Sequence, residues 1–141
     1  MGILNILVIC TGNSCRSQIA EGYLKYFIKE LNIKGNIFSA GIRAEGVKEK
    51  AIEIMADDGI DISNHTSNTI DEYYSTYISH VITVCDHANE SCPAYLKKAK
   101  LTHQNFSDPS KVIGSELEIK KAFEKCREEI KLFSFEFLKK I

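Results

Sequence analysis

The hydrophobic positions of this chain fall into blocks whose spacing changes from one segment to the next. Residues 3–9 form a nearly continuous apolar run, which is typical of a central parallel strand covered on both faces. From Ser17 to Leu31 apolar residues recur at helical spacing, which predicts an amphipathic helix of about four turns. Residues 37–40 then predict a short second strand.

The rest of the chain continues this alternation. A helix is expected over residues 48–58, a strand rich in β-branched side chains over residues 80–84, and a weaker strand over residues 100–105. Two capping boxes, each a Thr or Ser followed three residues later by Glu, predict the starts of a short helix and of a long C-terminal helix. The two pairs are Thr69 with Glu72 and Ser115 with Glu118.

Strands alternating with helices predict a doubly wound α/β fold, in which a four-stranded parallel sheet is flanked by helices. The 141 residues, 44% of them hydrophobic, fit a single domain over residues 1–141. Ligands bind such sheets at the carboxyl ends of the strands. Cys10 follows the first strand, Cys85 the third and Asp108 the fourth, so we expect these residues to converge on one pocket.

Charge and hydropathy exclude several classes of partner. The formal net charge is −1, so no overall positive field favours a nucleic acid or an anionic membrane. The apolar run near the N-terminus is too short for a signal peptide or a membrane span, and it lacks a basic flank. We therefore expect a cytoplasmic monomer in which any anion-binding site is local.

The segment from Cys10 to Ser17 has the composition of an oxyanion-binding loop with a sulfur nucleophile. Five residues, including Gly, Asn and Ser, separate Cys10 from Arg16, and the segment lies between a predicted strand and a predicted helix. Backbone N–H groups and a helix N-terminus attract a tetrahedral anion, and a guanidinium binds two of its oxygens. The alternative is an ordinary strand-to-helix turn with a buried thiol. Neither a kinase-type phosphate loop nor a dinucleotide-binding glycine motif occurs.

The other four cysteines divide into two pairs. Cys15, in a loop that a disulfide to Cys10 would distort, and Cys126, on the apolar face of the last helix, are interpreted as structural. Cys85 and Cys92 are separated by six residues without a β-branched or large apolar side chain, so we expect a mobile loop there. Such a loop permits a disulfide between them, although two incidental thiols would give the same pattern.

Asp108 lies in the sequence Ser-Asp-Pro-Ser, which is compatible with a turn or a helix N-cap. It becomes a candidate proton donor if its carboxyl group reaches the pocket. The four histidines show no metal-ligand spacing and no paired Cys-x-x-Cys occurs, so we expect no zinc site.

With these pieces together, the chain closely resembles the thioredoxin-coupled arsenate reductases, which share the fold of the low-molecular-weight protein tyrosine phosphatases. The resemblance spans almost the full length. The segments that carry it are Cys-Thr-Gly-Asn-Ser-Cys-Arg-Ser-Gln at 10–18, Ser-Ala-Gly at 39–41, Gly-Ile-Asp-Ile-Ser-Asn-His-Thr-Ser at 59–67, Val-Cys at 84–85 with Cys-Pro at 92–93, and Ser-Asp-Pro at 107–109.

The resemblance implies reduction of arsenate to arsenite. Cys10 would attack arsenate while Arg16 and the loop hold its oxygens, and Asp108 would protonate the departing hydroxide. A relay of Cys10, Cys85 and Cys92 would follow, with reduced thioredoxin as the electron donor and with no tightly bound cofactor. The implied substrate-binding residues are Thr11, Gly12, Asn13, Ser14, Cys15, Arg16 and Ser17.

One departure from the family pattern concerns a monovalent cation. Related reductases that bind potassium below the loop use an Asn, a Glu, a Ser and an Asp. Asn13, Glu21 and Ser39 match that pattern here, but Asn68 replaces the Asp. Because a carboxylate ligand is lost, we expect at most a weak potassium site and assign no metal ligand.

A phosphotyrosine phosphatase is the main alternative, because the same loop and acid hydrolyse phosphate esters. Phosphatases of this fold usually have Pro after the Arg-Ser of the loop and Tyr after Asp-Pro, whereas this chain has Gln18 and Ser110. They also have no need of Cys85 and Cys92. A redox-sensing or anion-binding module without turnover is a second alternative.

Overall fold

Four parallel strands form one sheet in the computed structural model, which describes residues 3–141. The strands are β1 (Asn5–Cys10), β2 (Asn36–Gly41), β3 (His80–Thr83) and β4 (Lys100–His103), in the spatial order β2-β1-β3-β4. Every residue of central β1 is buried, which explains why its sequence is apolar on both faces. The predicted four-stranded parallel sheet is confirmed.

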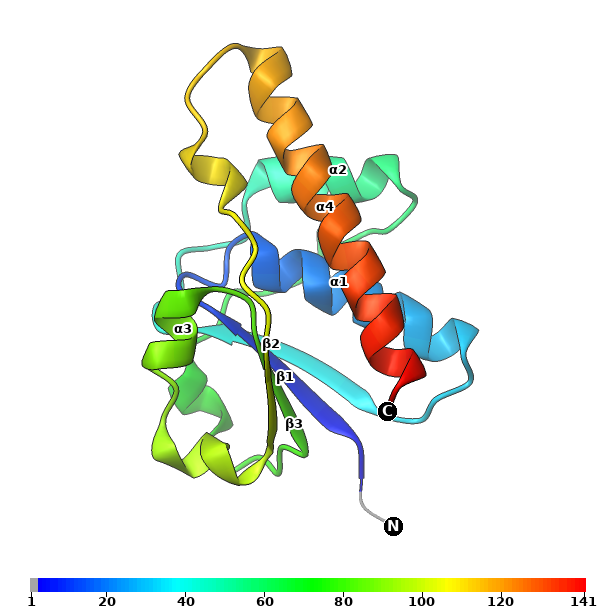
Figure 1. Cartoon of the computed structure of the whole chain (residues 1–141), viewed down its shortest axis with the longest axis vertical. Coiled ribbons are helices and arrows are strands. Elements are labelled where there is room, and N and C mark those ends of the chain that lie inside the picture. The colour runs from blue at the N-terminus through cyan, green and yellow to red at the C-terminus, as the bar shows by residue number, and fades with distance from the viewer. Residues whose placement is uncertain (1–2) are drawn as a thin grey trace.

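Three helices pack together over the sheet. These are α1 (Arg16–Glu30), which follows β1, α2 (Glu49–Asp57), which follows β2, and α4 (Glu116–Lys139), the last element of the chain. α1 and α4 lie against each other, and α2 contacts both (Figure 1). The apolar sides of α1 and α4 contribute buried side chains to the core, among them Ile19, Tyr23, Leu24, Phe123, Ile130 and Leu138.

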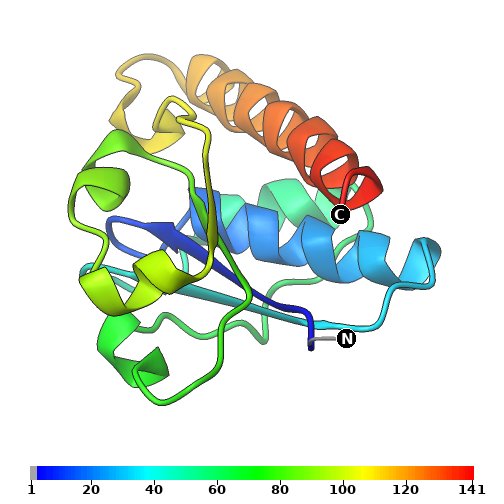
Figure 2. The same cartoon turned by 60° about the horizontal axis from the view of Figure 1, so that its bottom comes forward.

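A short helix, α3 (Asp86–Glu90), follows β3 and contacts β1 and β3. It lies on the side of the sheet away from α1 and α4, so helices flank both faces as a doubly wound fold requires (Figure 2). Short 3₁₀ segments complete the connections. They are η1 (Ile70–Tyr73), η2 (Ala94–Lys98) and η3 (Pro109–Lys111).

Both predicted capping boxes are present. Ser115 Oγ accepts the N–H of Glu118 at 3.2 Å, and Glu118 Oε1 accepts the N–H of Ser115 at 3.1 Å. Thr69 and Glu72 form the same reciprocal arrangement at the start of η1. These side chains satisfy N–H groups that the first turn of a helix leaves without partners, and they fix where both segments begin.

The expectation of a mobile loop between Cys85 and Cys92 is wrong, because this segment forms α3. Ala88 is the only residue of the helix that is fully buried, so the segment lacks the apolar stripe by which helices are recognised in sequence. Its first turn is capped instead by the Cys85 sulfur, which accepts the N–H of Ala88 at 3.4 Å. The contacts that hold this helix therefore cannot be predicted from the spacing of apolar residues in the sequence.

The carboxyl ends of the strands meet at one edge of the sheet, where Cys10 is the last residue of β1. Cys85 follows β3 after one residue, and Asp108 follows β4 after four. Within residues 3–141, no helix combines the length and the apolar composition that a membrane crossing needs.

Candidate active site

The loop between β1 and α1 is fixed from outside by its carbonyl groups. Those of Thr11, Gly12 and Ser14 each accept a backbone N–H from the 43–48 segment at 2.9 Å. With the carbonyls occupied on that side, the N–H groups of residues 12–15 have no acceptor among the described residues. They are free to bind an anion, as the loop composition predicted.

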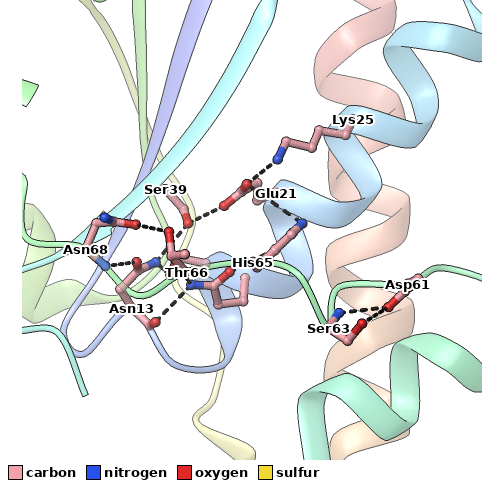
Figure 3. Close-up of polar contacts among 11 residues, drawn as sticks. Asn13, Glu21, Lys25, Ser39, Asp61, Ser63, His65, Thr66 and Asn68 are labelled. Atoms are coloured by element: carbon pink, nitrogen blue, oxygen red, sulfur yellow. Dashed lines mark hydrogen bonds and ion pairs between the residues drawn. The ribbon is translucent and has the colours of Figure 1, made fainter. Parts of the chain in front are cut away.

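Asn13 organises the base of the loop. Its backbone has φ 48°, a left-handed conformation that Asn adopts more readily than most residues, and its side chain is fully buried. Asn13 Oδ1 accepts the N–H of Asn68 at 2.7 Å (Figure 3). Its Nδ2 donates to Ser17 Oγ at 2.8 Å and to Ser39 Oγ at 2.9 Å. One amide therefore ties the loop to α1, to β2 and to the 66–69 segment.

These bonds determine the direction of the hydroxyl of Ser17. Its oxygen already accepts from the Asn13 amide, so its hydrogen is available to Cys10 Sγ, which lies 2.9 Å away. On the other side Ser39 donates to the Glu21 carboxylate. The network thus ends on two acceptors, Glu21 and the Cys10 sulfur. The hydrogen bond from Ser17 fixes the position of the Cys10 sulfur at the base of the anion loop.

Arg16 and Asp108 meet across the pocket, as the sequence predicted for Asp108. Arg16 Nη2 lies 3.5 Å from Asp108 Oδ2, and Arg16 Nη1 donates to the carbonyl of Phe106 at 2.8 Å. Asp108 Oδ1 accepts from the N–H of Ser110 at 3.0 Å and from its hydroxyl. Asp108 is therefore both the N-cap of η3 and a wall of the pocket.

The same surroundings act on the acidity of Asp108. Burial on its own would raise the pKa of this carboxyl. The hydrogen bonds from Ser110 and the charges of Arg16 and Lys111 outweigh burial and hold the pKa below its ordinary value. Asp108 is thus ionised in the resting protein, and a bound dianion that competes for Arg16 would shift it back toward the protonated form.

A cavity of about 230 Å³ lies over the loop, lined by Cys10, Arg16 and Asp108 among others. Its rim also carries Arg43 and Lys48, which the sequence interpretation did not single out. The signal for them was positional, since both follow β2 at the same carboxyl edge that indicated the other site residues. Arg43 is paired with Glu45 at 2.9 Å, but the lining as a whole holds four cations, with Arg16 and Lys111, against the two acids Glu45 and Asp108. The pocket is therefore locally positive in a chain whose net charge is −1.

Cys85 is brought to the loop from the next strand. Its sulfur lies 3.3 Å from the hydroxyl of Thr11, the residue that follows Cys10, and only 4% of Cys85 is exposed. Thr11 also contacts His87 of α3, with its hydroxyl 3.3 Å from Nδ1. Cys10 and Asp108 line one cavity, as expected, whereas Cys85 does not line it and reaches the loop only through its contact with Thr11.

Cys92 lies two residues beyond the end of α3 and is 7% exposed. Burial raises the pKa of its thiol above the usual value. A rise of about 1.5 Å per residue across the intervening helix separates the Cα atoms of Cys85 and Cys92 by about 10 Å. A disulfide needs about 4.4 to 6.8 Å, so α3 has to unwind before these two sulfurs can bond.

All five cysteines are free and buried. Burial raises the pKa of Cys15 far above its usual value and raises that of Cys126 to about 12, so both are held as thiols. Cys126 is 3% exposed within the core, and Cys15 forms part of the pocket wall. Both observations agree with the interpretation of these residues as structural.

The candidate potassium ligands are committed to other partners. The carboxylate of Glu21 accepts from Ser39 and from the ammonium of Lys25, which places a cationic side chain where a metal ion would be needed (Figure 3). Asn13 Oδ1 is taken by the backbone of Asn68. This donor set does not fit a potassium ion. Across residues 3–141 there is also no cluster of three His, Cys, Asp or Glu side chains that would hold a metal.

A family model described as low molecular weight phosphotyrosine protein phosphatase matches residues 5–141. An arsenate reductase of Staphylococcus aureus (strain Newman) is 44% identical over 127 residues, which is 90% of each chain. Arsenate reductase 2 of Staphylococcus haemolyticus is 46% identical over 126 residues, or 89% of each chain.

The fold is shared with a solved structure of the low molecular weight protein tyrosine phosphatase from T. tengcongensis. That structure superposes with a TM-score of 0.82 at 23% identity and covers 98% of this chain and 99% of its own. The family match and the sequence similarity both extend over nearly the whole length. The chain belongs to the low molecular weight phosphotyrosine protein phosphatase family.

Proposed function

We propose that this protein reduces arsenate to arsenite through a thiol relay of Cys10, Cys85 and Cys92, and that reduced thioredoxin regenerates it. The observation that carries the proposal is the position of the Cys85 sulfur, 3.3 Å from Thr11 of the anion loop. Hydrolysis of a phosphate ester needs one sulfur at this loop, whereas reduction needs a second. The curated relatives at 44% and 46% identity, both named arsenate reductases, support the same choice.

Arsenate binding uses the loop and Arg16. The free N–H groups of residues 12–15 and the guanidinium surround a tetrahedral dianion, while Lys48 and Lys111 attract it to the pocket. As the dianion takes up Arg16, it weakens one of the interactions that, after the hydrogen bonds from Ser110, hold the pKa of Asp108 down. Substrate binding thereby prepares Asp108 to carry a proton.

In the first chemical step the Cys10 thiolate attacks arsenic and forms a sulfur–arsenic bond. An arsenic–oxygen bond breaks, and Asp108 transfers its proton to the leaving hydroxide, which departs as water. Ser17 holds the thiolate in place before the attack. Arsenic is still pentavalent after this step.

In the second step the Cys85 thiolate attacks the Cys10 sulfur. A disulfide forms between the two cysteines, the sulfur–arsenic bond breaks, and its electron pair leaves with arsenic, which becomes arsenite. The two sulfurs have together lost two electrons. Thr11, whose hydroxyl contacts Cys85, orients the attacking sulfur.

In the third step Cys92 loses its proton to solvent and attacks Cys85. The Cys10–Cys85 bond breaks, Cys10 leaves as a thiolate, and a Cys85–Cys92 disulfide forms. This transfer moves the oxidised pair away from the anion pocket, where a protein reductant has no access. The dithiol of thioredoxin then supplies two electrons and two protons.

The experiment is a coupled assay of arsenate-dependent NADPH oxidation with thioredoxin and thioredoxin reductase. We expect turnover by the unmodified protein, none by Cys10→Ser, and at most a single turnover by Cys92→Ser. Cys126→Ser is the matched control, since it removes a buried thiol that the relay does not use. Undiminished multiple turnover by Cys92→Ser would contradict the relay.

A phosphotyrosine phosphatase is the second candidate, favoured by the Arg16–Asp108 pair over an anion loop, which suits ester hydrolysis equally well. Rapid hydrolysis of an aryl phosphate, combined with no arsenate-dependent NADPH oxidation, would favour this function. Absence of both activities would leave a redox-sensing or anion-binding module.

A further inference from the structure

The start of α3 is fastened to the sheet by polar side chains outside the anion pocket. His103, at the end of β4, places Nε2 2.8 Å from Asp86 Oδ1, on the first residue of α3. Its Nδ1 lies 2.7 Å from the hydroxyl of Thr83, at the end of β3. Asn105 Oδ1 accepts the backbone N–H of Asp86 at 3.1 Å. We call these four residues, Thr83, Asp86, His103 and Asn105, the α3 clasp.

The chemistry of the clasp residues determines which atom donates in the hydrogen bond between His103 and Asp86. A carboxylate only accepts, so the Nε2 of His103 carries the hydrogen that it shares with Asp86. Thr83 is completely buried and cannot exchange its partner for water, so it holds the other side of the imidazole ring in place. Its hydroxyl also lies 3.4 Å from Asn89 Oδ1, farther along the helix.

The contacts of Asp86 with His103 and Asn105 depend on a wound α3. A wound α3 keeps the Cα atoms of Cys85 and Cys92 about 10 Å apart, beyond the reach of a disulfide. Bonding the two sulfurs unwinds the helix, displaces Asp86 from His103 and removes the Cys85 sulfur from its cap on Ala88. The two contacts that Asp86 makes, with His103 and with Asn105, therefore stabilise the dithiol form over the disulfide form.

We propose that Asp86 and His103 are positioning residues for the relay, and that they make the Cys85–Cys92 disulfide easier to reduce by stabilising the wound, dithiol form of α3. The proposal rests on the proposed function for the relay itself. Stabilising the reduced form of a dithiol raises its reduction potential and makes its disulfide a stronger oxidant. The clasp would thus favour the return of the protein to its active dithiol form.

The expected effect is modest because Asp86 is exposed. Its side chain is 70% accessible and that of His103 is 29% accessible, and ion pairs at such sites contribute little. We expect removal of the pair to shift the dithiol–disulfide equilibrium about threefold toward the disulfide, or about 14 mV for a two-electron couple.

The test is a redox titration of the full chain carrying Cys10→Ser. This substitution removes the Cys10–Cys85 disulfide, so that Cys85 can pair with Cys92. Samples are equilibrated with mixtures of reduced and oxidised dithiothreitol, quenched by alkylation, and the Cys85–Cys92 disulfide is measured by mass spectrometry. Asp86→Asn and His103→Asn should each lower the reduction potential, and the double variant should lower it no further than the larger single effect. Asp86→Glu keeps the carboxylate, so its reduction potential should lie between those of Asp86→Asn and the chain with Asp86.

Asp57→Asn is the matched control, because it makes the same substitution at an exposed acid of α2. If the reduction potential of Asp86→Asn equals that of Asp57→Asn, or is higher, the proposed role of the clasp is overturned. The titration contains no arsenate, so this failure is distinct from failure of the coupled assay. If Cys85 and Cys92 form no disulfide at any ratio, the relay itself is overturned, and the role of the clasp with it.

Discussion

Ser17 Oγ lies 2.9 Å from Cys10 Sγ and accepts a hydrogen bond from the Asn13 amide, so its own hydrogen is directed at the sulfur. The nucleophile is therefore prepared by a residue of the first turn of α1, and the amide that prepares it also shapes the loop. Substrate binding and nucleophile activation share one buried network.

Ser17→Ala should slow the alkylation of Cys10 by iodoacetamide at neutral pH. Hydrogen bonds to charged groups contribute about 1.5 to 3 kcal/mol, and about 1.4 kcal/mol is a factor of ten, so we expect a loss of at least about tenfold. Peptide mass spectrometry identifies the modified residue. Ser134→Ala, another completely buried serine, is the control, and equal rates for the two variants would contradict the assignment.

Asp108→Asn should lower turnover in the coupled assay while tightening oxyanion binding. Loss of a general acid costs about a hundredfold or more, whereas loss of the carboxylate beside Arg16 leaves the guanidinium free for the anion. The measurements are kcat and the inhibition constant of phosphate.

Asp61→Asn offers a matched control for this experiment. Asp61 Oδ1 accepts the N–H of Ser63 at 2.8 Å and its hydroxyl at 2.6 Å, the arrangement that Asp108 makes with Ser110. Asp61 does not line the anion pocket, and it lies apart from Asn13 of the loop (Figure 3). A loss of turnover of similar size in Asp61→Asn would indicate that the effect of Asp108→Asn is structural.

Potassium should not stabilise this protein. The ammonium of Lys25 already neutralises Glu21, so exchanging KCl for NaCl at constant ionic strength should leave the midpoint of thermal unfolding unchanged. Lys25→Gln should lower the free energy of unfolding by about 1 kcal/mol, which is near the upper limit for a partly exposed ion pair. Lys29→Gln, one turn further along α1, is the control. A specific rise of the midpoint in KCl would show that the cation competes with Lys25.

His80 should make stability fall below neutral pH. Burial, reinforced by the charge of Lys100, lowers the pKa of His80 in the folded chain. The unfolded chain then binds the proton more readily, so the stability contributed by His80 is complete above about pH 6.5 and is lost as the pH falls below it. Urea midpoints at pH 7.5 and 5.5 should differ less in His80→Gln than in the unmodified protein. His87→Gln, at an exposed position, should keep the full difference.

Ser134→Ala should stabilise the fold. Ser134 is completely buried in α4, and its hydroxyl has no hydrogen-bond partner among residues 3–141. Removing an unsatisfied buried hydroxyl is worth about 1 kcal/mol, or about 3 °C in the midpoint of thermal unfolding. Ser115→Ala should do the opposite by about the same amount, because it removes the cap of the same helix. A decrease for Ser134→Ala would contradict the unsatisfied hydroxyl.

The sheet, its order of strands and helices, and both capping boxes could be predicted because each depends on local spacing. The meeting of Cys10 and Asp108 could also be anticipated, since the carboxyl ends of parallel strands share an edge. α3 could not, because its stability comes from His103, seventeen residues away, and from a cysteine sulfur acting as a cap. Arg43 and Lys48 were missed because backbone bonds from their segment to loop carbonyls place them at the pocket.

Because all five sulfurs are buried, none of the thiols of the resting protein is accessible to a large molecule. A small oxyanion reaches Cys10 through the cavity, but a protein disulfide finds no thiol at the surface with which to form a mixed adduct. On the proposed relay, the unwinding of α3 is what opens this region to a partner. While α3 stays wound, oxidised thioredoxin or any other protein disulfide would find no accessible thiol, so it could not draw electrons back out of the reduced protein.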